Sequence, residues 1–281
     1  MNILFSINRQ YIKHMKVCIQ SIIRFKEEEG YEFYVLHSDL NESDKIEIEE
    51  SFNESDVRIH FIYVDPSSFK DFPETDRYPK QIYYRIFASF LLPKHLEKIL
   101  YLDVDTIVIR SLKELYQMDF EGAYYIACTH VKKILKKVNN IRLGVENDFP
   151  YINTGVMMMN LELLRQNQSI DEVLDYVNMH KRDLLLPDQD IISALYGDKI
   201  KLIDSMIYNL SDRMIMLYNS NTLNEKMGIE WVRENATIIH YIGRNKPWKK
   251  NYIGILDAFY KEVLEIENKK INISEEGEIV Q

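Results

Sequence analysis

Two acids interrupt the apolar, β-branched run Ile99-Leu100-Tyr101-Leu102-Asp103-Val104-Asp105-Thr106-Ile107-Val108-Ile109. Successive side chains of a strand point to opposite faces, so an extended backbone predicts that Asp103 and Asp105 share one side. Two carboxylates about 4 Å apart repel by roughly 4 kcal/mol at an effective dielectric of about 20, so we expect a cation between them. Mg²⁺ or Mn²⁺, bound through carboxylates together with substrate phosphates, suits such a pair. The alternative is an acidic loop between two strands.

Short apolar segments alternate with helical patterns on both sides of this run. The expected strands are Ile3 to Ile7, Tyr31 to His37, Val57 to Val64, Ile99 to Ile109, Ala123 to Cys128, Lys199 to Ile203 and Thr237 to His240. The expected helices are Tyr11 to Ile23, Glu42 to Phe52, Tyr83 to Leu91, Val131 to Val138, Asn160 to His180, Asp188 to Tyr196 and Tyr252 to Ile266. The alternation predicts an α/β fold whose mostly parallel central sheet is flanked by helices. Ligands of open parallel sheets bind at the carboxyl ends of strands, where the acid pair falls.

Composition limits the classes of function. With 281 residues, 46% of them hydrophobic, the chain can bury one large core. A net charge of −9 argues against nucleic-acid binding, which normally needs an excess of Lys and Arg. The two cysteines, Cys18 and Cys128, lie in apolar surroundings and have no spacing typical of zinc or disulfides. Because neither a secretion signal nor a long apolar window is found, we expect a cytoplasmic protein.

A second informative segment is His240-Tyr241-Ile242-Gly243-Arg244-Asn245-Lys246-Pro247-Trp248, which follows an apolar strand. A neutral imidazole at a strand end can bind a metal, Gly243 permits close approach of the backbone to a phosphate, and Lys246 offers a positive charge. The alternative is a core histidine followed by an ordinary turn. Together with Asp103 and Asp105, the segment favours a site for a metal and a phosphate.

At these residues the sequence resembles the retaining glycosyltransferases of family 8, which include glycogenin and the bacterial lipopolysaccharide galactosyl- and glucosyltransferases. The resemblance covers roughly residues 1 to 250, and the bacterial enzymes are the more similar. Its motifs are Phe5-Ser6-Ile7-Asn8 with Tyr11, Tyr84-Arg85, Leu102-Asp103-Val104-Asp105, Asn153-Thr154-Gly155-Val156, Pro187-Asp188-Gln189-Asp190 and His240-x-x-Gly243-x-x-Lys246-Pro247-Trp248. It implies a GT-A type transferase domain over residues 1–250. Residues 251–281 would then form a C-terminal helix and an acidic tail.

The resemblance also implies roles for single residues. Asp103, Asp105 and His240 would hold Mn²⁺ or Mg²⁺ at the two phosphates of a UDP-sugar. The donor itself would be bound by Ser6, Asn8 and Tyr11 at the uridine, and by Arg85, Val104, Asn153, Thr154, Asp188, Gln189, Gly243 and Lys246 at the phosphates and the sugar. The catalytic residues would be Gln189, Asp188 and Lys246. For Tyr11 and Asp188 a structural role stays open, because Tyr11 can begin a helix core and Asp188 can cap a helix.

Several functions are compatible with these residues. The leading one is a metal-dependent, retaining transfer of glucose or galactose from a UDP-sugar to a saccharide or glycolipid acceptor, such as lipopolysaccharide or another surface glycan. A neutral amide is a poor nucleophile, so Gln189 would position and stabilise a short-lived ion pair. The alternative is a non-catalytic nucleotide-sugar-binding or scaffold protein. A sugar nucleotidyltransferase is disfavoured, since the segment near residue 10 is not a glycine-rich phosphate loop.

The acceptor is not encoded in these motifs. We expect its site in the variable loops Ser67 to Tyr78 and His130 to Pro150, where His130 stands near the position of an acid in the galactosyltransferases. The basic face of Val131 to Val138 and the acidic tail Ser274 to Gln281 predict at most peripheral membrane contact at the inner face. The sequence leaves the oligomeric state open.

Overall fold

The computed structural model describes residues 1–27, 30–53, 56–75, 78–130, 139–145 and 149–266. Its strands are β1 Asn2–Ser6, β2 Tyr31–His37, β3 Val57–Tyr63, β4 Lys98–Leu102, β5 Thr106–Val108, β6 Tyr125–Cys128, β7 Asn153–Asn160, β8 Ile200–Ile203 and β9 Ile238–His240. Its α-helices are α1 Ile12–Ile23, α2 Glu42–Glu50, α3 Gln81–Tyr84, α4 Ala88–Leu91, α5 Lys113–Gln117, α7 Leu161–Asn167, α8 Ile170–His180, α9 Pro187–Tyr196, α10 Ser205–Tyr208, α11 Asp212–Asn219 and α12 Ile229–Asn235. Residues 257–266 form a further helix. Short 3₁₀ helices lie at Arg9–Tyr11, Pro66–Phe69, Arg85–Phe87 and Gly197–Lys199.

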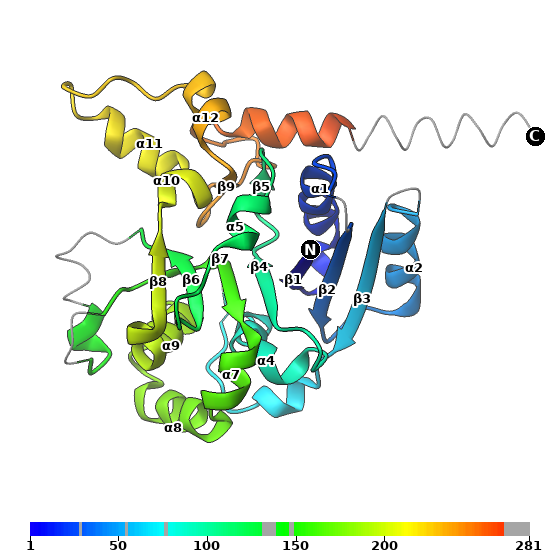
Figure 1. Ribbon diagram of the computed structural model, residues 1–281, viewed down its shortest axis with the longest axis vertical. Coiled ribbons are helices and arrows are strands. Elements are labelled where there is room, and N and C mark those ends of the chain that lie inside the picture. Colours follow the sequence, from blue (N-terminus) through cyan, green and yellow to red (C-terminus); the bar gives the residue numbers. More distant parts are fainter. Residues whose placement is uncertain (28–29, 54–55, 76–77, 131–138, 146–148, 267–281) are drawn as a thin grey trace, which may run out of the picture.

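A seven-stranded sheet with the order β3-β2-β1-β4-β7-β6-β8 forms the centre of the molecule, with helices on both faces (Figure 1). Strand β7 pairs antiparallel with both of its neighbours, β4 and β6, whereas β3-β2-β1-β4 and β6-β8 pair in parallel. The expected α/β class with a mostly parallel sheet is therefore confirmed.

Strand β7 was not predicted. Its run Met157-Met158-Met159 is fully buried at the sheet centre, yet methionine is an unbranched residue that ranks among the good helix formers. Asn160, expected inside a helix, instead ends β7 and caps α7 by accepting a hydrogen bond from the Leu163 backbone N–H at 3.0 Å. The expected helix Asn160 to His180 is therefore wrong as one unit. It is broken before Ser169, whose side chain caps α8.

The run Ile99 to Ile109 is not one strand. Strand β4 ends at Leu102, and the chain turns so that the Thr106 backbone N–H donates to the Asp103 carbonyl at 3.1 Å. Strand β5 then leaves the large sheet and pairs antiparallel with β9, which places Thr106 opposite His240. The prediction that Asp103 and Asp105 share a strand face is wrong, and the alternative of an acidic loop between two strands describes the backbone correctly. The apolar pattern continues after the turn because β5 is a buried strand that pairs with β9.

Three apolar clusters hold these parts together. One cluster lies on each face of the large sheet. The third joins Ile107 of β5 and Ile239 of β9 to Leu256, Phe259 and Val263 near and within the C-terminal helix. Figure 1 shows that helix beside β5 and β9. The division of the chain at residue 250 stays a prediction.

The remaining expectations concern single segments. The helix expected over Tyr252 to Ile266 begins at residue 257, and Ile255 and Ile266 of its predicted buried face are exposed. The segment Tyr83 to Leu91 forms three short helical pieces rather than one helix. Within the described residues, no helix has the length and apolar character needed to cross a bilayer. The basic segment Val131 to Val138 and the tail Ser274 to Gln281 lie outside the described residues.

Candidate metal and donor site

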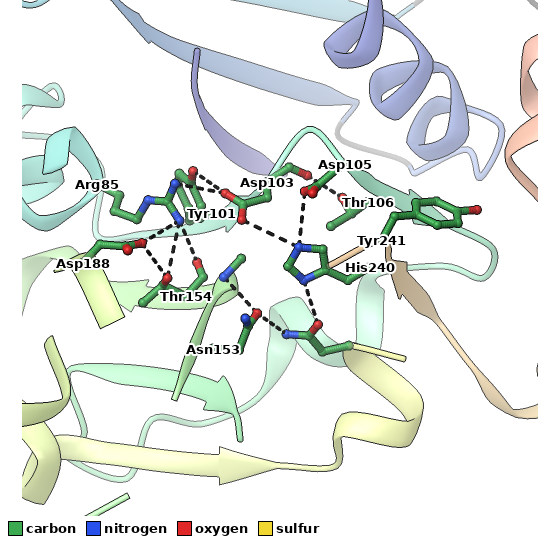
Figure 2. A network of polar contacts seen from close by, with 12 residues as sticks. Arg85, Tyr101, Asp103, Asp105, Thr106, Asn153, Thr154, Asp188, His240 and Tyr241 are labelled. Atoms are coloured by element: carbon green, nitrogen blue, oxygen red, sulfur yellow. Dashed lines mark hydrogen bonds and ion pairs between the residues drawn. The ribbon is translucent and has the colours of Figure 1, made fainter. Parts of the chain in front are cut away.

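Asp103, Asp105 and His240 converge where the large sheet meets the two-stranded sheet (Figure 2). His240 Nε2 lies 3.2 Å from Asp105 Oδ1 and 3.7 Å from Asp103 Oδ2. One ligand atom of each residue lies within 4.8 Å of the other two. Two carboxylate oxygens and one imidazole nitrogen at this spacing fit a divalent cation such as Mn²⁺ or Mg²⁺. The carboxylates converge because the turn folds them toward β9 and not because a strand face orients them.

The other oxygen of each acid is already bound within the protein. Asp103 Oδ1 accepts a hydrogen bond from the Tyr101 hydroxyl at 2.8 Å and pairs with Arg85 Nη2 at 3.0 Å. Asp105 Oδ2 contacts the ammonium of Lys246. Burial alone would raise the pKa of Asp105, but the charge of Lys246 and the contact with His240 outweigh it and hold this pKa well below its usual range. Each acid therefore turns a single oxygen, Asp103 Oδ2 or Asp105 Oδ1, toward His240.

Arg85 connects this cluster to α9. Its buried guanidinium lies 3.0 Å from Asp188 Oδ2 through Nη1, and its central carbon lies 4.3 Å from the centroid of the Tyr101 ring. The Thr154 hydroxyl donates to Asp188 Oδ2 at 2.6 Å (Figure 2). Burial raises the pKa of Asp188, and the charge of Arg85 opposes that shift. Arg85 thus holds two acids in place, and its predicted contact with donor phosphate or sugar stays a prediction.

A chain of amides lies on the other side of His240. Asn153 Oδ1 accepts hydrogen bonds from the Gly155 backbone N–H at 3.2 Å and from Asn209 Nδ2 at 2.9 Å. Asn209 Oδ1 lies 2.9 Å from His240 Nδ1, and the Asn209 carbonyl accepts from His130 Nε2 at 2.9 Å. Sequence reasoning missed Asn209, because a single asparagine after a short helix carries no pattern that links it to β9.

Gly155 leaves room for the cluster. A Cβ at this position would lie 2.2 Å from His240 Cε1 and 2.7 Å from Asp103 Oδ2, far inside contact distance. Gly243 serves a different purpose, because its φ of +80° is a conformation that L side chains rarely adopt. The first glycine is needed for space and the second for the turn that begins the Lys246 loop.

Gln189 and the two acids beside it on α9 differ in exposure and in contacts. Gln189 is partly exposed between the buried Asp188 and Asp190. Asp190 accepts hydrogen bonds from the Tyr151 hydroxyl at 2.7 Å and from the Leu185 backbone N–H at 2.7 Å, and it pairs with Arg142. Asp190 is therefore a structural residue, whereas Asp188 belongs to the network of Arg85.

The residues expected at uridine lie where β1 ends and the 3₁₀ helix Arg9–Tyr11 begins. The Ser6 hydroxyl donates to the Gln81 carbonyl at 2.6 Å, and Asn8 Oδ1 accepts from the Gln10 backbone N–H at 3.1 Å. Tyr11 is 40% exposed, so its ring is accessible for stacking. Ser6 and Asn8 thus have roles in the local fold, and their predicted contacts with uridine stay predictions.

The Lys246 loop is held against α1. Lys246 Nζ donates to the Tyr241 carbonyl at 2.7 Å as well as contacting Asp105. Trp248 stacks on His14 of α1 with ring centroids 3.7 Å apart. Burial, followed by the nearby charge of Lys13, lowers the pKa of His14 to about 4, so the stacked imidazole is neutral at pH 7. The stack therefore joins the loop of Lys246 to the helix that follows the predicted uridine site.

Comparisons with known proteins identify the family and the fold. The family model described as glycosyl transferase family 8 matches residues 2–252. A putative glycosyltransferase of Haemophilus influenzae is 28% identical over 251 residues, which cover 89% of this chain and 73% of that one. Lipopolysaccharide 1,2-glucosyltransferase of Escherichia coli K12 is 23% identical over 268 residues, covering 94% and 78%. The crystal structure of the galactosyltransferase LgtC with donor and acceptor sugar analogs aligns with a TM-score of 0.79 at 22% identity, covering 94% and 95%. The expected GT-A fold is confirmed.

Proposed function

This chain belongs to glycosyl transferase family 8, and on that premise we propose that it transfers glucose or galactose from a UDP-sugar to a saccharide acceptor with retention of configuration. The observation that carries the proposal is the convergence of Asp103, Asp105 and His240 next to the Arg85–Asp188 pair. Likeness to a lipopolysaccharide glucosyltransferase supports a lipopolysaccharide or other surface glycan as the acceptor.

Three side-chain atoms form the proposed cation site. Asp103 Oδ2, Asp105 Oδ1 and His240 Nε2 would hold Mn²⁺ or Mg²⁺, because these three atoms lie close together. The second polar atom of each side chain already contacts another residue of the protein. When bound, the ion would stabilise, as a Lewis acid, the negative charge that develops on the β-phosphate as UDP departs. Lys246 adds a fixed positive charge to the same region. The reaction needs both, because the leaving group of a UDP-sugar is a dianionic phosphate.

The sugar would lie between the acids and α9. Asp188, fixed by Arg85 and Thr154, orients sugar hydroxyls from an immobile position. Gln189 lies on the same helix turn and is partly exposed, so its amide can approach the anomeric carbon. A neutral amide is a poor nucleophile, but it can stabilise the positive charge that develops on the sugar. This favours a mechanism in which UDP leaves and the acceptor attacks on the same face of the sugar, within a short-lived ion pair. Asn153, Thr154 and the Val104 backbone complete the predicted donor contacts.

The first test is UDP release from a panel of UDP-sugars, with Mn²⁺, with Mg²⁺ and with EDTA. We expect one donor to be hydrolysed slowly, and the chelator and Asp103→Asn each to reduce that rate at least about 100-fold, since both remove Lewis-acid stabilisation of the leaving group. The matched control is Asp65→Asn, which alters an exposed aspartate that caps a 3₁₀ helix and should leave the rate unchanged. Tight donor binding without metal-dependent turnover at any donor, even with saccharide acceptors added, would favour the non-catalytic nucleotide-sugar-binding alternative.

The stereochemistry has a test of its own. Proton NMR of the product formed from an α-linked UDP-sugar should show an α-linkage. A β-linked product would overturn the role given to Gln189, because inversion requires attack from the opposite face.

A further inference from the structure

His240 turns one ring nitrogen to the acids and the other to Asn209. Its Nε2 lies 3.2 Å from Asp105 Oδ1 (Figure 2). Its Nδ1 lies 2.9 Å from Asn209 Oδ1. A neutral imidazole has its proton on one nitrogen, and only the nitrogen without a proton can bind a metal. The partner of Nδ1 therefore decides whether Nε2 is available as a ligand.

The direction of each hydrogen bond in the amide chain follows from a backbone group. A backbone N–H can only donate, so the Asn153 atom that lies 3.2 Å from Gly155 N is the carbonyl oxygen. The same oxygen lies 2.9 Å from the side chain of Asn209, which must meet it with its NH₂ group. Asn209 is thereby left with its oxygen facing His240 Nδ1. Because an amide oxygen only accepts, the proton of a neutral His240 ring is on Nδ1, which leaves the lone pair of Nε2 for the cation.

We propose that Asn209 is a positioning residue that holds His240 in the Nδ1–H tautomer and so makes Nε2 the ligand of the divalent cation. The inference rests on the proposed function, since it concerns the cation of the same site. Asn209 does not touch the ligand atoms and acts through the imidazole. Second partners of metal-binding histidines typically change metal affinity by about 10- to 100-fold.

Hydrogen bonds of its own backbone fix the position of Asn209. Its side chain is fully buried, its N–H donates to the Ser205 carbonyl at 3.2 Å, and its carbonyl accepts from His130. The next residue, Leu210, donates to the Ile238 carbonyl at 3.0 Å and accepts from the His240 N–H at 2.8 Å. These backbone bonds fix the register of Asn209 and His240 relative to each other. These backbone bonds therefore hold the amide opposite Nδ1.

The tautomer can be observed directly. Wild-type protein labelled with ¹⁵N-histidine is saturated with Mg²⁺, and two-bond ¹H–¹⁵N correlations are recorded, with His240→Gln to assign the signals. We expect His240 to have a protonated Nδ1 and an unprotonated Nε2. An Nε2–H tautomer would overturn the proposal. The measurement uses wild-type protein, so it does not depend on whether a variant of Asn209 folds.

The second experiment measures Mn²⁺ affinity by electron paramagnetic resonance without any donor sugar. Asn209→Leu keeps the size of the side chain and removes the acceptor, so we expect affinity to fall about 10- to 100-fold. Turnover should return at saturating Mn²⁺, which gives a raised KM for the metal with kcat retained. Asn209→Asp keeps an acceptor for Nδ1 and should recover much of the lost affinity.

The matched control is Asn219→Leu on α11. Asn219 also makes two side-chain hydrogen bonds, from the Met227 N–H at 2.8 Å and to the Met227 carbonyl at 2.9 Å, but it lies outside the site. We expect lowered stability and unchanged Mn²⁺ affinity. If Asn209→Leu binds Mn²⁺ as tightly as wild type, the role of Asn209 is wrong and the metal site stands. If wild type itself fails to bind Mn²⁺ or Mg²⁺, the metal site proposed above is wrong and this inference falls with it.

Discussion

Arg85 and Asp188 form an ion pair of 3.0 Å in which both side chains are more than nine-tenths buried. The same guanidinium also lies 3.0 Å from Asp103 Oδ1, so one cation joins a predicted metal ligand to a predicted sugar ligand. Arg85→Leu would leave two acids near each other without their cation. We expect a loss of about 3–5 kcal/mol in the free energy of unfolding, measured with urea.

The control for this variant is Arg9→Leu, because Arg9 pairs with Asp44 while its side chain stays 58% exposed. Such a surface pair contributes about 0–1 kcal/mol. Similar losses for the two variants would contradict the structural role given to Arg85.

Gly155→Ala tests the space around the cation site. The added Cβ must displace the His240 ring or the Asp103 carboxylate, since it would lie 2.2 and 2.7 Å from their atoms. We expect Mn²⁺ affinity to fall at least about tenfold, with a stability loss of about 1–3 kcal/mol. Gly228→Ala is the control, because a Cβ there meets nothing within 4 Å. Unchanged affinity in Gly155→Ala would show that the site tolerates the shift.

Lys246→Met separates metal binding from turnover. Lys246 contacts Asp105 Oδ2, so its removal takes away a cation that repels Mn²⁺. We expect Mn²⁺ affinity without donor to be equal or higher, while kcat falls about 10²- to 10³-fold because a charge that stabilises the departing UDP is lost. Lys249→Met, at an exposed lysine of the same loop, should change neither quantity. Parallel losses of affinity and kcat would place Lys246 in cation binding instead.

His130 makes stability depend on pH. Burial, followed by the nearness of His240, lowers the pKa of His130 from 6.5 to about 4. As the pH falls below 6.5, the unfolded chain takes up a proton that the folded protein refuses, so stability decreases down to pH 4 and then levels off. The expected loss is about 3 kcal/mol.

His130→Gln can keep the hydrogen bond to the Asn209 carbonyl and removes the titrating group, so stability should fall less steeply between pH 7 and pH 4. His95→Gln, which makes the same substitution at an exposed histidine, is the matched control. Urea unfolding at several pH values measures both. An unchanged slope in His130→Gln would show that other groups cause the dependence.

The sequence predicted β1 and β2 well because each is a largely buried apolar run bounded by polar residues, as in Tyr31–His37. It also identified Asp103, Asp105 and His240, although the reason given for the two acids was wrong. A period of two holds only while the backbone stays extended, and the turn before Thr106 breaks it. Local patterns thus found the residues of the site but not the backbone that presents them.

What the sequence could not predict depends on contacts between distant segments. Asn209 lies beside His240 because β9 runs past it, and Arg85 meets Asp103 from the turn after β4 and Asp188 from α9. No pattern near either residue encodes these neighbours. The strand β7 was missed for a related reason, since its methionines fit the sheet only once strands on both sides bury them.

The position of β9 sets the order in which the site can be completed during synthesis. Two of the three proposed ligands lie in the turn after β4, while the third ends the last strand of the described residues. A ribosome-bound chain that ends after β8 therefore has both acids but neither His240 nor Lys246. Because domains fold as units while the chain emerges from its N-terminal end, the proposed site for the cation and the sugar nucleotide can form only after the two sheets have met.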